Sequence, residues 1–153
     1  MRNIRLNHGV PGPTVQVMGA GENKQLLRAI FSELAKGNTK PFRDAMADDF
    51  SWTVTGTTEW SGTYSGKRTV LSELMGPLFA QFAGRYTNTA QRFIADGDHV
   101  VVECRGRVRT KAGTPYNNSY CYVCRLADGK LEELTEYLDT ELVATALAPP
   151  RAA

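Results

Sequence analysis

Four consecutive segments in the second half of the chain alternate apolar and polar residues, and this pattern limits the possible folds more than any other feature. The segments are residues 86–95, 99–110, 115–126 and 130–139. A period of two is typical of β-strands with one buried face. Asp128-Gly129 is a typical tight turn, since both residues tolerate the positive φ that such a turn requires. The pattern predicts an antiparallel meander.

The first half has helical periodicity. Apolar residues recur at helical spacing over 22–36, Thr39 and Pro41 are suited to starting a short second helix, and a third helix is predicted over about 66–82. Gly76-Pro77 should break or bend that third helix, because proline lacks the N–H donor. Residues 50–54 alternate as a strand, and 56–66 are expected to form a loop. Helices followed by a meander indicate an α+β fold with the helices on one face of the sheet.

Composition favours one domain without special partners. The chain has 153 residues, and its formal net charge is 18 − 16 = +2. No apolar run approaches the roughly 18 residues of a membrane span, and this charge does not require a nucleic acid. An RNA-binding stripe of Arg105, Arg107 and Arg109 is the alternative, but no aromatic RNA-reading signature accompanies it. We therefore expect neither a membrane nor a nucleic-acid partner.

The chain divides into an arm (1–21), a domain (22–145) and a tail (146–153). Within the arm, residues 14–18 are able to add as an edge strand. The arm lacks the apolar core of a secretory signal, so a cytoplasmic location is expected. Cys121 and Cys124 form a C-x-x-C pair, but three residues along a strand point to opposite faces. Ordinary buried thiols are therefore expected, without a metal site or a required cofactor.

Two turns, taken as Ala112-Gly113 and Asp128-Gly129, set a predicted register for the last three strands. One face then carries Glu103, Arg105, Arg107, Asn118, Tyr120, Tyr122, Thr135, Tyr137 and Asp139. The opposite face carries Val100, Val102, Cys104, Val108, Cys121, Val123, Leu134 and Leu138. The polar-aromatic face has two interpretations. It is either a solvated or subunit-contacting surface, or the wall of a ligand pocket.

The order of elements resembles the nuclear transport factor 2-like superfamily, in its SnoaL-like, ketosteroid isomerase-related branch. The resemblance covers about residues 22–145 and rests on Trp60-Ser-Gly-Thr-Tyr-Ser-Gly-Lys, Gly97-Asp-His-Val-Val-Val-Glu, Asn118-Ser-Tyr-Cys-Tyr, Asp128-Gly-Lys-Leu-Glu and Glu136-Tyr-Leu-Asp. It implies a cone-shaped α+β roll: three N-terminal helices packed on a strongly curved, mainly antiparallel sheet with a pocket between. It also implies a homodimer formed through the outer sheet face, on which the valines would lie.

The resemblance favours the pocket interpretation of the polar-aromatic face. Arg105, Asn118, Tyr120 and Tyr122 would then bind ligand. The remaining walls would be formed by Trp52, Trp60, Phe79 and Phe82, although aromatic residues at such spacings also serve as plain core.

Asp139 and Glu103 are the candidate acid–base groups, with Tyr137 as a candidate phenol donor. A carboxylate in an aromatic pocket loses solvation, which raises its pKa, and a nearby phenol stabilises an enolate oxygen. Arg105 and Arg107 on the same face support a structural ion-pair alternative. The first helix lacks the tyrosine that ketosteroid isomerases use. The sequence therefore predicts a cofactor-independent isomerase, cyclase or hydrolase for a mainly apolar substrate, or a non-catalytic protein that binds a small apolar ligand.

Overall fold

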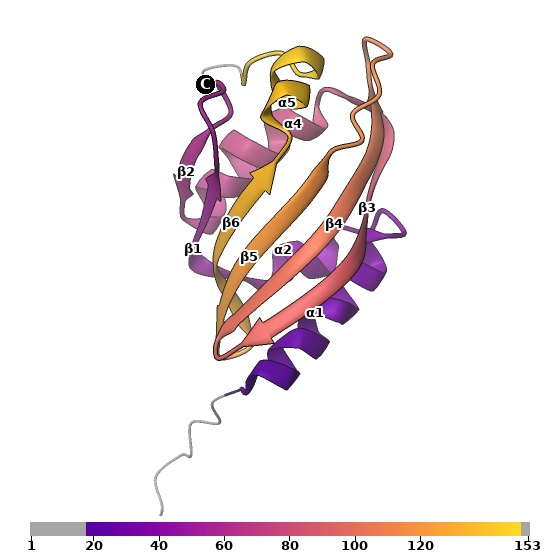
Figure 1. The fold of residues 1–153 in the computed structure, drawn as a ribbon. Helices are drawn as coiled ribbons and strands as arrows, with labels where there is room; N and C mark the ends of the chain where they lie inside the picture. Colours follow the sequence, from indigo (N-terminus) through magenta and orange to yellow (C-terminus); the bar gives the residue numbers. More distant parts are fainter. Residues whose placement is uncertain (1–17, 151–153) are drawn as a thin grey trace, which may run out of the picture.

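The computed structural model describes residues 18–150 as one curved sheet with helices on its concave face (Figure 1). The predicted edge strand at 14–18 and the last three residues of the tail lie essentially outside this range. The helical elements are α1 (Ala20–Leu34), α2 (Lys40–Ala45), α3 (Lys67–Thr69), the π-helix η1 (Val70–Met75), α4 (Gly76–Phe79) and α5 (Thr140–Ala146). The strands are β1 (Met46–Val54), β2 (Gly62–Ser65), β3 (Phe82–Asp96), β4 (His99–Thr110), β5 (Ser119–Ala127) and β6 (Lys130–Leu138).

The strand order is β2-β1-β6-β5-β4-β3, so the last four strands form the expected meander. β1 joins it by pairing parallel to β6, whereas the other neighbours are antiparallel. The sheet is strongly curved and not closed. The predicted α+β fold with helices on one face is therefore confirmed. None of the helices within residues 18–150 has the length and apolar character that crossing a membrane requires.

The first helix packs its apolar stripe onto the sheet. Leu27, Ile30, Phe31 and Leu34 are buried along α1, as their spacing predicts. Phe31 meets Phe93 of β3 edge-to-face, with ring centroids 5.8 Å apart. At the N-terminus of α1, the carboxylate of Glu22 accepts a hydrogen bond from the backbone N–H of Gly19 at 2.9 Å, which satisfies one free donor.

Gly76-Pro77 interrupts the third helical segment as expected, in the form of a wider π-helical turn. The N–H of Gly76 bonds to the carbonyl of Leu71, five residues earlier. Pro77 has no N–H to continue the α-helical ladder, so the turn widens just before it. This segment ends at Phe79, three residues earlier than expected.

Two elements were not predicted. β2 lies within the expected 56–66 loop and pairs with β1, where Trp52 lies opposite Tyr64. The helix α5 follows β6, and Asp139 caps it by accepting a hydrogen bond from the N–H of Leu142 at 3.1 Å. An aspartate followed by Thr140-Glu141 is a helix-start signal that the sequence already contained.

The predicted register of β4, β5 and β6 is wrong by one residue at each pairing. The first turn has three residues rather than two: Gly113 has φ +88°, and the N–H of Thr110 bonds to the carbonyl of Thr114. Glu103 therefore lies opposite Cys121 rather than Tyr122. The Asp128-Gly129 turn forms as predicted, with Ala127 opposite Lys130.

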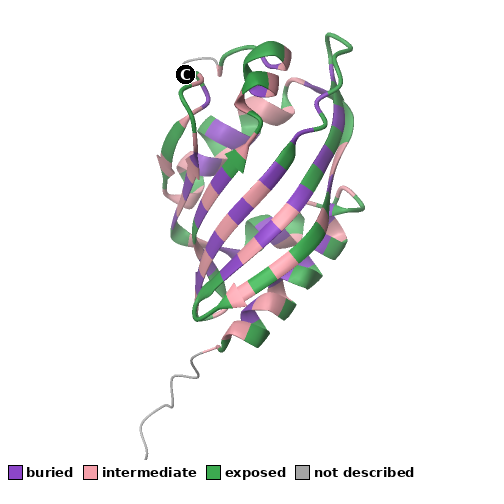
Figure 2. Cartoon of the chain, in the orientation of Figure 1, coloured by how far each residue is buried: buried purple, intermediate pink, exposed green. Residues whose placement is uncertain are grey.

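A bulge beyond that second turn produces the other shift. The pairing changes between Arg125 and Leu126, so that Tyr122 lies opposite Glu136 instead of Thr135. Because side chains alternate with a period of two, each one-residue shift moves the neighbouring strand's set to the opposite face. Tyr120 and Tyr122 of β5 consequently share the concave face with Val100 and Val102 of β4, so the expected position of these valines on the outer face is wrong. Figure 2 shows the resulting alternation of buried residues with intermediate or exposed ones along these strands.

Candidate functional site

A cavity lies between the concave sheet face and the helices α1, α2, η1 and α4. Its lining is mainly apolar and aromatic. The lining residues are Leu34, Thr39, Phe42, Trp52, Leu74, Met75, Leu78, Phe79, Tyr86, Asn88, Tyr116, Tyr120, Tyr122 and Glu136. The space open to the centres of water molecules is about 60 Å³. One water needs roughly 10–15 Å³ by this measure, so the cavity has room for several waters or a small flat group.

Glu136 is the carboxylate of this cavity. It lies on β6, where it is 7% exposed. Its Oε2 accepts a hydrogen bond of 2.8 Å from the indole Nε1 of Trp52. None of the ion pairs within residues 18–150 involves Glu136. Burial raises its pKa from 4.5 to about 7, although the Trp52 hydrogen bond opposes that rise.

Trp52 is held in place by aromatic neighbours. Its ring meets Phe42, Phe50 and Tyr122 edge-on, with centroids 5.6, 6.3 and 6.0 Å away. The parallel pairing of β1 with β6 places Val54 opposite Glu136 and Trp52 opposite Leu134. Strand pairing and aromatic packing together therefore aim the indole N–H at the carboxylate.

Four phenols line the cavity beside Glu136. They are Tyr86, Tyr116, Tyr120 and Tyr122. Burial raises the pKa of each, and that of Tyr116 reaches about 12, so all four keep their protons at neutral pH. Gly106 of β4 makes room for two of them, since a Cβ there would lie 2.8 Å from Tyr86 and 3.1 Å from Tyr120.

Two buried amides support these phenols. The Nδ2 of Asn88 lies 3.2 Å from the hydroxyl of Tyr86 and 3.5 Å from that of Tyr122. Its Oδ1 has no hydrogen-bond partner within residues 18–150. Asn118 Nδ2 donates to the Tyr116 hydroxyl at 3.4 Å. The cavity therefore combines one carboxyl group with several phenols in an apolar enclosure.

Four of the predicted ligand-binding residues line the cavity: Trp52, Phe79, Tyr120 and Tyr122. Phe82 packs behind the lining, stacked on Tyr86 and Tyr116 at 5.6 and 5.9 Å. Trp60 lies elsewhere: its indole N–H donates to the carbonyl of Ala148, after the C-terminal helix.

Asn118 is fully buried beside the lining, and its side chain bonds to the backbone of Asp139. The predicted proximity of Asn118 and Asp139 is thus found, but the Asp139 carboxylate is not part of it. Asp139 is exposed and caps α5.

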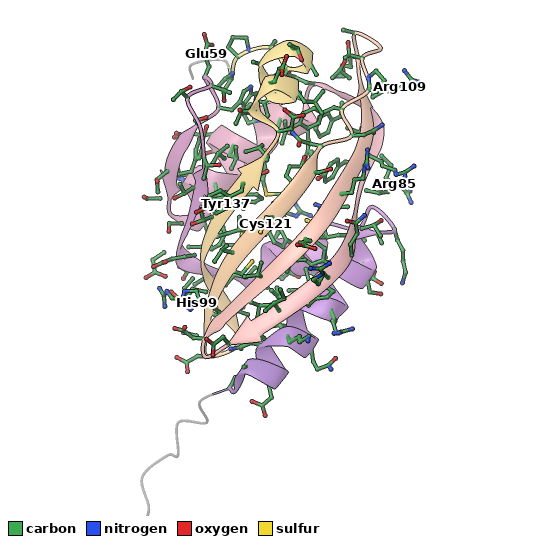
Figure 3. The ribbon with its side chains drawn as sticks, in the orientation of Figure 1. Glu59, Arg85, His99, Arg109, Cys121 and Tyr137 are labelled. Atoms are coloured by element: carbon green, nitrogen blue, oxygen red, sulfur yellow. The ribbon has the colours of Figure 1, made fainter. Side chains whose placement is uncertain are left out.

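The predicted concave positions of Glu103, Arg105 and Tyr137 are wrong, because the register shifts turn them to the outer face. Glu103 forms an ion pair with Arg92 at 3.2 Å, and Arg105 is exposed opposite Thr89 and Ser119. Tyr137 is 53% exposed. Figure 3 shows Tyr137 on the sheet surface turned away from the helices, next to Cys121, its cross-strand partner.

Sequence reasoning missed Glu136, Tyr86, Asn88 and Tyr116. The signal for Glu136 was present, because it alternates with Leu134 and Leu138, both assigned to an apolar face. A glutamate at an apolar position of a strand is a buried carboxylate, which is uncommon and often functional. No comparable signal marked Asn88, which lies between two register irregularities of β3, or Tyr116, which precedes β5.

The cysteines lie as expected on opposite sheet faces. Cys124 is buried and Cys121 is half-buried, and neither forms a disulfide. Burial raises the pKa of the Cys124 thiol to about 12. In the described part of the chain, no group of three or more His, Cys, Asp or Glu side chains is placed to hold a metal ion.

The sequence profile of the SnoaL-like domain matches residues 27–134, which is most of the chain. The chain belongs to the SnoaL-like domain family. This membership confirms the resemblance seen in the sequence. No curated protein matches the chain significantly.

Solved structures share the SnoaL-like fold. A putative SnoaL-like polyketide cyclase from Jannaschia sp. CCS1 is 19% identical, with a TM-score of 0.68 over 94% of this chain and 99% of its own. A nuclear transport factor 2-like protein from Burkholderia thailandensis E264 is 21% identical, with a TM-score of 0.70 over 83% and 98%. TerC, co-crystallised with polyporic acid, is 20% identical, with a TM-score of 0.68 over 81% and 96%. At these identities the likeness establishes the fold alone.

Proposed function

We propose that this SnoaL-like protein catalyses proton transfer on a small, mainly apolar molecule, as an isomerase or cyclase does, with Glu136 as the acid–base group. The observation that carries the proposal is the state of Glu136: a carboxylate in an aromatic cavity, with no cationic side chain among the lining residues of the described range and with a pKa raised to about 7. A group with a pKa near the working pH both accepts and returns a proton readily. Glu136 thus takes the role that the sequence assigned to Asp139 and Glu103.

The surrounding phenols fit the same chemistry. Removal of a proton next to a carbonyl leaves negative charge on oxygen, and phenol hydroxyls stabilise such an oxyanion in a site that excludes water. Tyr122 lies directly opposite Glu136 on the neighbouring strand. The fold is shared with a putative polyketide cyclase and with TerC, which was crystallised with polyporic acid. Both likenesses support a small-molecule site and leave the substrate open.

The test uses acetophenone, whose methyl hydrogens are acidic because they adjoin a carbonyl. In D₂O, loss of the methyl proton signal in NMR measures proton abstraction followed by return of deuterium. We expect the wild-type protein to accelerate this exchange, with a rate that rises as pH increases through about 7, the pKa of Glu136. Glu136→Gln should slow it at least roughly 100-fold, since general acid–base groups contribute about 10²–10⁴-fold.

Glu103→Gln is the matched control, because it makes the same change on the outer face of the same sheet. It should leave the exchange rate unaltered. Equal exchange by wild type and Glu136→Gln would remove Glu136 as the proton-transfer group.

Non-catalytic binding of a small apolar ligand is the second candidate, and the mainly apolar lining of the cavity favours it. It differs in its outcome: ligands would shift the resonances of cavity residues, but wild-type protein would not accelerate the exchange of any ketone tested.

A further inference from the structure

The backbone determines whether the hydroxyl of one cavity phenol, Tyr116, donates or accepts a hydrogen bond in its contact with Asn118. Asn118 is fully buried, and its Oδ1 accepts a hydrogen bond from the N–H of Asp139 at 3.0 Å. Its Nδ2 donates to the carbonyl of the same residue at 3.1 Å. A backbone N–H only donates and a carbonyl only accepts, so the amide has one possible orientation.

The second hydrogen of that Nδ2 faces Tyr116, whose hydroxyl oxygen lies 3.4 Å away. An amide nitrogen does not accept hydrogen bonds, so the Tyr116 oxygen must be the acceptor in this contact. The Tyr116 O–H is then left to donate elsewhere, either to the neighbouring Tyr120 hydroxyl or to a bound molecule. Among the hydrogen bonds within residues 18–150, none is donated by Tyr116, although the side chain is only 2% exposed and lines the cavity.

Tyr116 is also held firmly and stays protonated. Its ring stacks on Phe82 at 5.9 Å with an interplanar angle of 28°. Burial raises the pKa of the phenol to about 12, so it carries its hydrogen throughout the neutral range. In contrast, the hydrogen-bond partners of the Asn88 side chain are other side chains. The backbone therefore does not determine whether the hydroxyls of Tyr86 and Tyr122 donate or accept.

We propose that Tyr116 recognises an acceptor oxygen of the bound molecule, a ketone, ester or enolate oxygen, and that Asn118 is the positioning residue that directs the Tyr116 hydroxyl to it. The inference rests on the proposed function in taking the cavity as the place where the reacting molecule binds. It adds which of the four phenols meets the substrate oxygen, Tyr116, and which residue orients that phenol, Asn118. A buried hydroxyl whose hydrogen is not donated in any hydrogen bond found within residues 18–150 disfavours a purely apolar ligand at this point.

The experiment compares acetophenone with α-methylstyrene, which has nearly the same shape but carries C=CH₂ in place of C=O. Dissociation constants are measured by NMR titration. The quantity compared is the affinity ratio, the dissociation constant of α-methylstyrene divided by that of acetophenone. We expect this ratio to be at least about ten in wild-type protein. Tyr116→Phe should reduce this ratio to nearly one while leaving the affinity for α-methylstyrene unchanged. Tyr137→Phe, which removes a hydroxyl from the outer face, should keep the wild-type ratio.

Asn118→Asp tests the positioning role. It places an oxygen where the donating nitrogen was, so the Tyr116 hydroxyl should turn toward it and the ratio should fall as in Tyr116→Phe. A merely structural role for Asn118 would weaken binding of both probes equally and leave the ratio unaltered, which would overturn the assignment. The ratio in wild-type protein alone is a further check that needs no variant: a value near one would overturn the proposal.

The two proposals fail in different ways. In one outcome, the hydrogen–deuterium exchange of acetophenone depends on Glu136, but Tyr116→Phe leaves the affinity ratio of the two probes unchanged. This outcome would support the proposed function and overturn this inference. In the other outcome, the affinity ratio depends on Tyr116, but wild-type protein does not accelerate hydrogen–deuterium exchange. This outcome would support the inference and overturn catalysis.

Discussion

The two faces of the sheet carry similar residues and give them different chemistry. The concave face holds Glu136 and Tyr122, and the outer face holds Glu103 and Tyr137. Glu103 is paired with Arg92 and open to water, whereas Glu136 is enclosed by aromatic rings and forms no ion pair with any residue from 18 to 150. Removal of water is what turns an ordinary carboxylate into a group that titrates near neutrality. The chemistry of a carboxylate in this sheet therefore depends on the face to which it points and not on its residue type.

The largest expected effect on stability is the pH dependence caused by Glu136. In the unfolded chain Glu136 loses its proton near 4.5, and in the folded protein its pKa is about 7. Between these values only the folded state holds the proton, so the free energy of unfolding falls as pH rises and levels off above about 7. The shift corresponds to about 3 kcal/mol, at roughly 1.36 kcal/mol per pKa unit.

Urea unfolding at pH 5 and pH 8 measures this loss. Glu136→Gln should abolish it and make the protein more stable than wild type at pH 8. The outer-face variant Glu103→Gln should retain the wild-type loss. A wild-type loss that persists in Glu136→Gln would mean that another group causes it.

The next effect concerns the space between two phenols. Gly106→Ala adds a methyl group 2.8 Å from Tyr86 and 3.1 Å from Tyr120, so the rings must move toward the cavity. Overpacking of this kind costs about 1–3 kcal/mol of unfolding free energy. Thermal unfolding should show the loss, and binding of acetophenone should weaken with it. Arg105→Ala, one residue away on the exposed face, should change stability by less than about 0.5 kcal/mol. Comparable losses in both variants would contradict the steric explanation.

The smallest effect on stability is expected on the outer face, which we propose as the surface of a homodimer. Tyr137 and Ile94, both 53% exposed, are the exposed large hydrophobic side chains within residues 18–150. Tyr137→Glu should alter the stability of the monomer by less than about 0.5 kcal/mol but shift sedimentation from dimer to monomer. A wild-type protein that sediments as a monomer at micromolar concentration would refute the proposed dimer.

The fold was accessible from sequence because it depends on local signals. The bounds of β4 and the Asp128-Gly129 turn follow from alternation and turn chemistry, and the structure confirms both. The site was less accessible. A third residue in the first turn and a bulge near Leu126 each reverse a strand's faces, and neither has a clear sequence signature. The sequence shows Glu136 as a charged residue at an apolar position, but only its burial in the structure makes it a candidate acid–base group.

The amino-acid sequence by its local patterns specifies that this chain forms helices packed against an antiparallel meander. Hydrophobic periodicity and turn residues set secondary structure through neighbours a few positions away. Tertiary structure decided which carboxylate meets the phenols, because pairing across strands sets the inner face and the inner face alone excludes water. Glu136 is thus defined by residues far from it in the chain: Trp52, which donates to it, and Tyr122, which lies opposite.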